Sequence, residues 1–411
     1  MADYGEMRQK LTFKEKLLQS LSEAEAEEQA RTQTVIKDKQ HLLVEMLVEG
    51  HPQSFVDFFY LTHDQNPEGA PTREELEAHD IDPDTYVPED EVPLESLGYL
   101  KANLVEVDSA ARRGDMKSVY LAYTNLARFF ESNSNHKKAI FFYEKCYSIA
   151  QQARDIHGEL EANLNLGVAH ENINDVAKAI TFHERHLELA TEAHIDAEMV
   201  SANRNLVKVY QRQAEEQESA GNIDASIESY HRMMKAAKAS HDLPEQGLAS
   251  YRIGMAYQKL DNPQKALGFH GEYLQLCRVC GDRTGEGSAC CALAQCYQDL
   301  EDVTQAISYL EQFLDLSKTA NPSNHARACC SLGVIYSKQH KFERAVTYFE
   351  KFFDVAKTLN DRRLLDIARV NLGISRGSAK TGRFMEVVVN DMHTLLQWKN
   401  VRMPIDAAGA E

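Results

Sequence analysis

Three histidines stand at spacings that could bring imidazole groups to one metal ion. His183 and His186 are three residues apart, so they would share one face of a helix, and His170 belongs to the stretch before them. Imidazole is a common zinc ligand, but a tetrahedral site needs four ligands and no convincing fourth is evident. We therefore expect these histidines to serve packing or surface roles, and we expect no metal or other cofactor.

The cysteines form a second candidate zinc set. Cys277 and Cys280 make a Cys-x-x-Cys pair, but they fall at the end of a predicted helix. Later cysteines fall where packed helices need small apolar groups, and they include Cys290, Cys291, Cys329 and Cys330. Free cysteine packs as a small hydrophobe, so buried thiols are the favoured interpretation and zinc or redox chemistry is the alternative. Eight cysteines without framework spacing fit a reducing, intracellular compartment.

Asparagines recur at a spacing suited to binding a peptide backbone. Asn125, Asn165 and Asn205 follow one another at a constant interval of forty positions, and Asn371 recurs near the end of the chain. An amide both donates and accepts hydrogen bonds, so a row of them can hold an extended peptide without reading its side chains. The basic residues near this row, which could receive an acidic ligand, are Arg128, Arg204, Lys208 and Arg252. The alternative is that the amides only stabilise contacts between helices.

A repeat with the same period must position these side chains. A small residue recurs at Ala139, Ala179, Ser226, Ala266, Ala306 and Ala345, and in all but one case a ring lies nine residues before it. Those rings are Phe130, His170, Tyr257, Tyr297 and Tyr336. Self-similarity at a fixed period of this length is typical of a solenoid, in which each unit contacts only its neighbours.

Each repeat is predicted to be a hairpin of two antiparallel helices. Turn and N-cap residues separate the helices, as at Gly114-Asp115, Asn174-Asp175 and Gly281-Asp282. A glycine or alanine in the first helix allows the second helix to approach closely. Aromatic residues of the second helix are expected to lean on the following repeat, and they are Phe142, Phe182, Phe269, Tyr309 and Tyr348.

The pattern resembles the long form of the tetratricopeptide repeat, which has roughly forty positions. The stretch from Cys280 to Gly287 is typical of that form, and the resemblance runs from Ser96 to about Lys399. Six repeats are clear, and a seventh from Leu364 to Trp398 is degenerate, as a terminal cap should be. The resemblance implies an all-α, right-handed α-solenoid of about seven repeats, in which the asparagine position faces the concave groove.

The third repeat carries an insertion. Tyr210 and Ser226 are sixteen positions apart where the other repeats have nine, and the seven extra residues lie within Gln211 to Ala220. Seven residues are close to two helical turns, so the apolar face returns nearly in phase. The insertion predicts a longer hairpin that projects beyond the edge of the solenoid, either as a docking element or as a passive extension.

We divide the chain into an N-terminal helical extension (1–62), an acidic proline-rich linker (63–95), the solenoid (96–398) and a C-terminal tail (399–411). Residues 64–95 contain twelve carboxylates against one basic residue, Arg73, which disfavours a packed core. This linker is either a spacer or an ordered strap on the solenoid or a partner. The net charge of −18 disfavours nucleic acid and anionic membranes as partners, and no apolar run is long enough to span a bilayer.

Catalytic motifs are not evident in the sequence. It contains no Gly-rich phosphate loop, no nucleophile elbow and no His-Glu-x-x-His motif. We therefore predict that the chain is not an enzyme and that it works by presenting a binding surface.

Sequence stretches before, at the start of and at the end of the repeats indicate a more specific family. Leu43 to His51 with Ser54-Phe55 precede the solenoid, the repeats open with Leu126 to Phe130 and Phe142 to Cys146, and they close with Leu395 to Lys399. Together with the third-repeat insertion, these stretches resemble the tetratricopeptide repeat protein 29 family.

That resemblance implies a non-enzymatic scaffold of the cilium or flagellum. The partners that it implies are the heavy-chain tail of a single-headed inner-arm dynein, a MYND-zinc-finger protein and other axonemal docking proteins. The location that it implies is the cytoplasm, the cytoskeleton and the axoneme. The alternative is a cytoplasmic peptide-binding adaptor of the kinesin-light-chain or spindle-orientation type.

Overall fold

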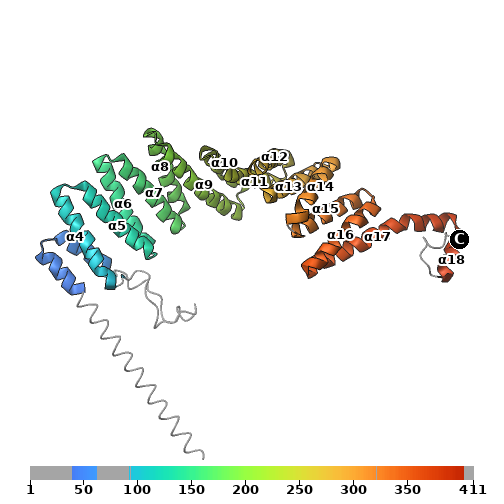
Figure 1. Cartoon of the computed structure of the whole chain (residues 1–411), viewed down its shortest axis with the longest axis horizontal. Coiled ribbons are helices and arrows are strands. Elements are labelled where there is room, and N and C mark those ends of the chain that lie inside the picture. The colour runs from blue at the N-terminus through green and yellow to red at the C-terminus, as the bar shows by residue number, and fades with distance from the viewer. Residues whose placement is uncertain (1–38, 63–91, 93, 321, 402–411) are drawn as a thin grey trace, which may run out of the picture. The chain divides into compact units, whose positions relative to one another are not determined.

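The computed structural model describes residues 39–62, 92, 94–320 and 322–401, and every regular element in these ranges is a helix (Figure 1). The chain divides into two compact units, Met1–Ala202 and Asn203–Glu411, and the division falls inside α9 (Asp196–Ser219). The predicted all-α fold of tandem helix hairpins is confirmed. Residues 1–38, most of the predicted acidic linker and the part of the predicted tail from 402 to 411 lie outside the described ranges.

The first unit stacks its helices in chain order. After a helical stretch at residues 39–48 come α2 (Pro52–Thr62), the 3-10 turn η2 (Leu94–Ser96), α4 (Leu97–Arg113), α5 (Met116–Ser132), α6 (His136–Ala153), α7 (Ile156–Asn172) and α8 (Val176–Glu192). Helix α2 packs against α4 with Phe58 fully buried, and Ser54 Oγ donates to the carbonyl oxygen of Leu104 at 2.9 Å. Phe59 and Tyr60 of the same helix are exposed.

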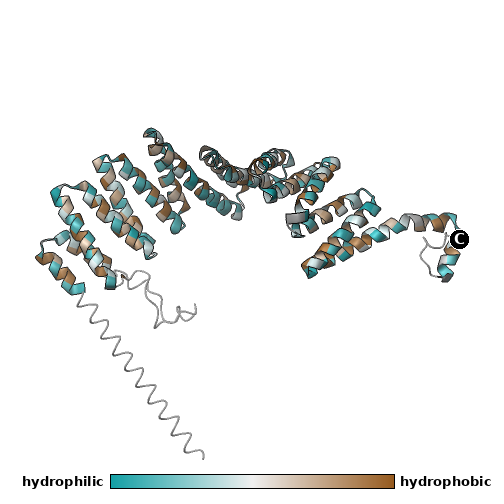
Figure 2. Cartoon of the chain, in the orientation of Figure 1, coloured by the Kyte–Doolittle hydropathy of each residue, from teal (hydrophilic) through white to brown (hydrophobic). Residues whose placement is uncertain are grey.

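The second unit continues the hairpins. Its helices after α9 are α10 (Ile223–Ala239), α11 (Leu243–Lys259), α12 (Pro263–Cys280), α13 (Arg283–Asp299), α14 (Val303–Ala320), α15 (Pro322–Lys338), α16 (Phe342–Leu359), α17 (Arg362–Asn390) and α18 (Met392–Val401). Brown and teal residues alternate along these helices, as expected where one face is buried against neighbours (Figure 2). Helices of the described residues are all too short or too polar to cross a bilayer.

Short polar residues set the hairpin boundaries. The side chains of Asp115, Asn135 and Asp175 accept hydrogen bonds from backbone N–H groups in the first turn of α5, α6 and α8. Asn262 and Asp282 do the same for α12 and α13. Such N-caps satisfy donors that have no partner within the helix, so the boundaries are fixed locally by the sequence.

Rings twelve residues apart stack in five of the described hairpins. Phe130 of α5 and Phe142 of α6 lie 5.6 Å apart between ring centroids with an interplanar angle of 7°. The same stacking joins His170 to Phe182, Tyr257 to Phe269, Tyr297 to Tyr309 and Tyr336 to Tyr348. This stacking on the first helix of the same hairpin was not predicted from the sequence, and Phe142 also shares a core cluster with Leu166 and Ala169 of the following repeat.

Close packing explains the small residues. A Cβ atom added to Gly167 would overlap the ring of His183, one added to Gly254 would lie 2.5 Å from His270, and one on Gly333 would lie 2.7 Å from Phe349. In all three pairs the ring follows the glycine by sixteen positions. Glycine is needed there because the ring occupies the volume of a side chain.

The insertion in the third repeat lengthens one helix only. Helix α9 has 24 residues whereas α10 keeps 17, so the predicted projecting hairpin is wrong. The small residue of the first helix is instead Ala214, which is fully buried and lies twelve residues before Ser226. Gln217 and Ser229 stand where the other hairpins have stacked rings, and Ser229 donates a 2.8 Å hydrogen bond to Gln217. Ala214 lies two turns after Val207 on the same helix face, so the repeat pattern of the sequence fits either residue.

The seventh repeat departs from the hairpin pattern. Helix α17 runs for 29 residues without a turn where the first helix of each preceding hairpin except α9 has 17, and the short α18 follows it (Figure 1). The sequence predicted a degenerate terminal repeat, and the structure shows that its second helix does not fold back.

Candidate peptide-binding surfaces

In the first unit, the predicted asparagine position lies on half-buried surface of α5 and α7. The Asn125 amide donates to Asn103 Oδ1 at 3.3 Å, which links α5 to α4, and Asn165 has no hydrogen-bond partner among the described residues. Asn163, two residues earlier, is fully buried and donates to the carbonyl of Glu159. The amide of Asn165 is therefore free to bind a ligand, whereas that of Asn125 shares its donor with Asn103.

The charge beside these amides is balanced. Arg128 of α5 donates to Glu161 of α7 at 3.1 Å, and both side chains are largely exposed. Glu161 also accepts from the hydroxyl of Tyr120, and burial raises the pKa of that phenol with help from the same carboxylate. An exposed ion pair contributes at most about 1 kcal/mol. Because Glu161 would repel an acidic ligand, this face suits the neutral backbone of an extended peptide.

In the second unit, α9 presents unpaired positive charge. Arg204 and Lys208 are exposed, lie one turn apart on the same face, and make no ion pair with a described residue. Asn205 lies beside them, half-buried and also without a hydrogen-bond partner in the described ranges. This cluster is the better receptor for a carboxylate.

Arg252 contributes less than expected. It lies on α11 and donates to Glu215 of α9 at 3.3 Å, and Lys259 of α11 pairs with Glu218 of α9. These carboxylates already neutralise the two cations. Of the predicted residues of the second unit, Arg204, Asn205 and Lys208 thus share one surface, and Arg252 belongs to an ion pair between α9 and α11.

The histidine cluster is used for packing. His183 Nε2 lies 2.7 Å from a Glu171 carboxylate oxygen, and His186 Nε2 lies 3.1 Å from Glu198. Both rings are fully buried, and burial lowers the pKa of His186 despite the nearby carboxylate. Within the described ranges, no group of three or more His, Cys, Asp or Glu side chains is arranged to hold a metal ion.

The cysteines differ in burial. Burial raises the pKa of Cys146, Cys290, Cys296 and Cys329 to about 11. Cys280 is exposed. The interpretation of buried structural thiols therefore fits most of this set.

Alkylation should separate the two kinds of thiol. Only the thiolate reacts, and a pKa raised by two units lowers its population about a hundredfold at pH 8. We expect iodoacetamide to label Cys280 first and to reach Cys290 and Cys329 only after unfolding in urea, as followed by peptide mass spectrometry. Equal labelling rates of Cys280 and Cys290 in the folded protein would contradict this.

Comparison with known proteins finds similar repeats and similar whole chains. Tetratricopeptide-repeat models match residues 120–152, 163–193 and 287–358. Tetratricopeptide repeat protein 29 of Trypanosoma brucei brucei is 25% identical over 87% of this chain and 73% of its own length. The human protein of that name is 25% identical over 68% of this chain. The chain therefore contains tetratricopeptide repeats and is similar to tetratricopeptide repeat protein 29.

The relatives are longer than the matched region. The alignments with the human and macaque proteins cover 59% of those chains. Among solved structures, a signal transduction ATPase with a tetratricopeptide repeat sensor from Pyrococcus horikoshii is 17% identical, covers 74% of this chain and 49% of its own, and has a TM-score of 0.40. At that score the likeness adds nothing to the fold described above.

Two residues of the first-unit surface, Asn103 and Glu161, were not predicted from the sequence. Asn103 lies on α4, the helix before that of Asn125. The two asparagines are 22 positions apart, which does not match the forty-position interval of the other asparagines. Glu161 has no periodic counterpart that would mark it as the partner of Arg128. No periodic signal in the sequence marks Asn103 as a neighbour of Asn125.

Proposed function

We propose that this tetratricopeptide-repeat protein is a non-enzymatic scaffold of the ciliary or flagellar axoneme. In this role it associates with the heavy-chain tail of a single-headed inner-arm dynein and supports docking and motility. A MYND-zinc-finger protein and other axonemal docking proteins are its further partners, and its location is the cytoplasm, the cytoskeleton and the axoneme. The observation that carries the proposal is the relationship to tetratricopeptide repeat protein 29 over 87% of the chain.

The surfaces of the two units support a scaffold over an enzyme. Free amides and cations lie on the helix faces at Asn165 and at Arg204 to Lys208, where another polypeptide can be bound. The described buried histidines and cysteines are engaged in packing, so they supply no exposed acid, base or nucleophile.

Fractionation of cilia tests the axonemal proposal. The protein should remain with axonemes after detergent extraction and should be released by high salt together with inner-arm dynein. Recovery entirely in the detergent-soluble membrane and matrix fraction would overturn the proposal.

A cytoplasmic peptide-binding adaptor is the second candidate. It is favoured by the unpaired Arg204 and Lys208 beside Asn205, which suit an acidic peptide. It differs from the first candidate in requiring a short linear ligand with measurable affinity for one isolated surface.

Paired variants test where such a ligand binds. We expect Arg204→Glu with Lys208→Glu to weaken an acidic twelve-residue peptide selected on the full chain at least tenfold, because two attractive charges become repulsive. We expect Asn125→Ala with Asn165→Ala to weaken a neutral peptide about tenfold, since two backbone contacts are lost. Fluorescence anisotropy measures both.

The matched control removes exposed amides from second helices. Gln152→Ala on α6 with Gln275→Ala on α12 should leave both affinities unchanged, since neither side chain lies on the candidate surfaces. If neither candidate pair changes binding more than this control, the two surfaces are not the peptide sites.

A further inference from the structure

In each complete hairpin, the small residue of the first helix is followed sixteen positions later by a bulky, buried residue of the second helix. The three glycines at this position face His183, His270 and Phe349, each sixteen positions after its glycine. The residue at the same offset in the other hairpins is Tyr143, Tyr230 or Leu310, and each is at most 2% exposed. A buried ring or leucine therefore occupies this position in all six hairpins.

Gly373 of α17 is the exception. It stands forty positions after Gly333, and an added Cβ would meet nothing within 4 Å. The residue sixteen positions later is Val389, which lies farther along the same helix and is 73% exposed. The position that a second helix covers elsewhere is open here.

The sequence explains why α17 does not turn back. Other hairpins turn at residues such as Asn174 and Asp261, which adopt positive φ and are followed by Asp175 and Asn262 as N-caps. The corresponding residue is Lys380, but Glu301 adopts positive φ at the same position of the α13–α14 hairpin, so the length of this side chain does not by itself prevent a turn. Met385 stands where the other hairpins have alanine or serine, and its bulk would overpack the crossing.

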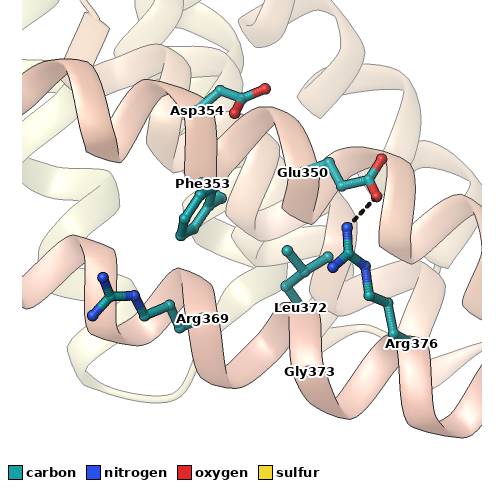
Figure 3. Close-up of a pocket in the computed structure, with 7 residues that line it drawn as sticks. All are labelled: Glu350, Phe353, Asp354, Arg369, Leu372, Gly373 and Arg376. Atoms are coloured by element: carbon teal, nitrogen blue, oxygen red, sulfur yellow. Dashed lines mark hydrogen bonds and ion pairs between the residues drawn. The ribbon is translucent and has the colours of Figure 1, made fainter.

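The open position adjoins a groove between α16 and α17. Figure 3 shows Phe353 of α16 and Leu372 of α17 pointing into it, with Gly373 beside them. Arg376 donates to Glu350 at 2.7 Å at one end, and Arg369, which pairs with Asp366 at 3.4 Å, lies toward the other (Figure 3). The groove therefore has an apolar floor and charged edges.

An apolar strip borders the groove. Val370 and Ile374 lie three residues before and one residue after Gly373, and each is 60% exposed; Ile367 extends the strip by one turn. The residues forty positions earlier are Cys330 and Val334, and both are partly buried against the core. The same helix face is thus covered in the sixth repeat and bare in the seventh.

The charge of α17 indicates what covers it. Six of its residues are basic and two are acidic, although the whole chain carries a net charge of −18. Arg362 and Arg363 are exposed at its start, and their side chains make no ion pair with the described residues. A covering helix that carries carboxylates would meet these cations, whereas a basic one would be repelled.

We propose that the groove of α16 and α17 binds an acidic amphipathic helix of a partner protein. This helix supplies the second helix that the last hairpin lacks and places a ring against Gly373. Its apolar face covers Phe353, Leu372 and the strip of Val370 and Ile374, and its carboxylates face Arg362 and Arg363 at the start of α17. This surface is independent of the two candidate surfaces described above.

A peptide built from the last complete second helix tests the proposal. The probe is the sequence of α16, Phe342–Leu359, with Arg344, Lys351 and Lys357 changed to glutamate, held helical by a side-chain lactam and labelled with fluorescein. The opposite probe keeps those three residues and changes Glu343, Glu350 and Asp354 to lysine. We expect the acidic probe to bind the full chain at least tenfold more tightly than the basic probe.

Variants of the full chain locate the binding. Gly373→Leu fills the open position and should weaken the acidic probe at least tenfold. Gly377→Leu makes the same change in the same helix, at a glycine outside the groove with nothing within 4 Å, and should leave affinity unchanged. Arg369→Glu should weaken binding through charge.

Three results would overturn the proposal. They are equal binding of the two probes, no loss of affinity in Gly373→Leu, and equal losses in Gly373→Leu and Gly377→Leu. A basic helix with an apolar strip could instead bind a lipid surface. A membrane would be the ligand, in place of a partner helix, if three results occurred together. The chain would bind vesicles containing phosphatidylserine, Arg369→Glu would weaken that binding, and the acidic probe would not bind measurably.

Discussion

Replacing Gly333 with leucine is expected to unfold the end of the second unit locally, at a cost of about 3 kcal/mol. A Cβ alone would lie 2.7 to 2.8 Å from three ring atoms of Phe349, and Phe349 is 1% exposed, so its ring cannot move without disturbing the core. Because stacked repeats contact only their neighbours, the damage should centre on α15 to α17. Hydrogen exchange resolved by peptide measures this directly.

The control is the same substitution at an open glycine. Gly268 lies on α12, and a Cβ atom added there would meet nothing within 4 Å, so Gly268→Leu should be neutral or slightly stabilising through helix propensity. In Gly333→Leu, amides of α5 to α8 should keep their protection. A uniform loss of protection across both units would contradict local failure.

The features predicted well from the sequence are those fixed by short-range chemistry. The hairpin boundaries at Asp115, Asn135, Asp175 and Asp282 follow from residues that cap the next helix with their own side chains. The positions of buried small residues follow from the period of the repeat, and Ala139 and Ala179 are fully buried as expected. Both signals repeat, so an error in one repeat is corrected by the others.

Register within one long helix could not be predicted in the same way. In α9, Val207 and Ala214 lie two turns apart on one face, and the hydrogen bonds of Ser229 with Gln217 and of Tyr230 with Glu218 identify Ala214 as the residue that meets α10. The continuous course of α17 was missed for a related reason. A degenerate repeat and a missing second helix leave the same weak pattern in the sequence.

The candidate binding residues stay a prediction, but the structure shows which of their charges are already paired. Asn165, Arg204 and Lys208 are accessible, whereas Arg128 and Arg252 are paired with Glu161 and Glu215. Ion pairs between neighbouring first helices depend on side chains 33 and 37 residues apart, and no local rule relates such residues. The charge available to a ligand therefore emerges only from the folded arrangement.

Replacing His270 with phenylalanine should stabilise the α11–α12 hairpin, and by an amount that grows in acid. His270 is fully buried against Gly254, neither ring nitrogen has a partner in the described structure, and burial lowers its pKa from 6.5 to about 4. Phe349 fills the equivalent position against Gly333, so a phenyl ring fits such a contact. Removing two unsatisfied nitrogens should contribute about 2 kcal/mol at neutral pH.

The sign of the pH dependence follows from proton binding. Between pH 6.5 and 4 the unfolded chain protonates His270 while the folded chain does not, so the wild-type protein loses stability as the pH falls. A difference of about 2.5 between the two pKa values lowers the free energy of unfolding by about 3 kcal/mol, and this reduction is complete below pH 4. His270→Phe abolishes this loss. Hydrogen exchange of α11 and α12 at pH 7 and pH 4.5 should show the advantage of the variant rising toward acid, with α15 and α16 as an internal reference that the substitution does not change. A constant advantage at both pH values would mean that His270 is protonated in the folded state, or that its burial is incomplete.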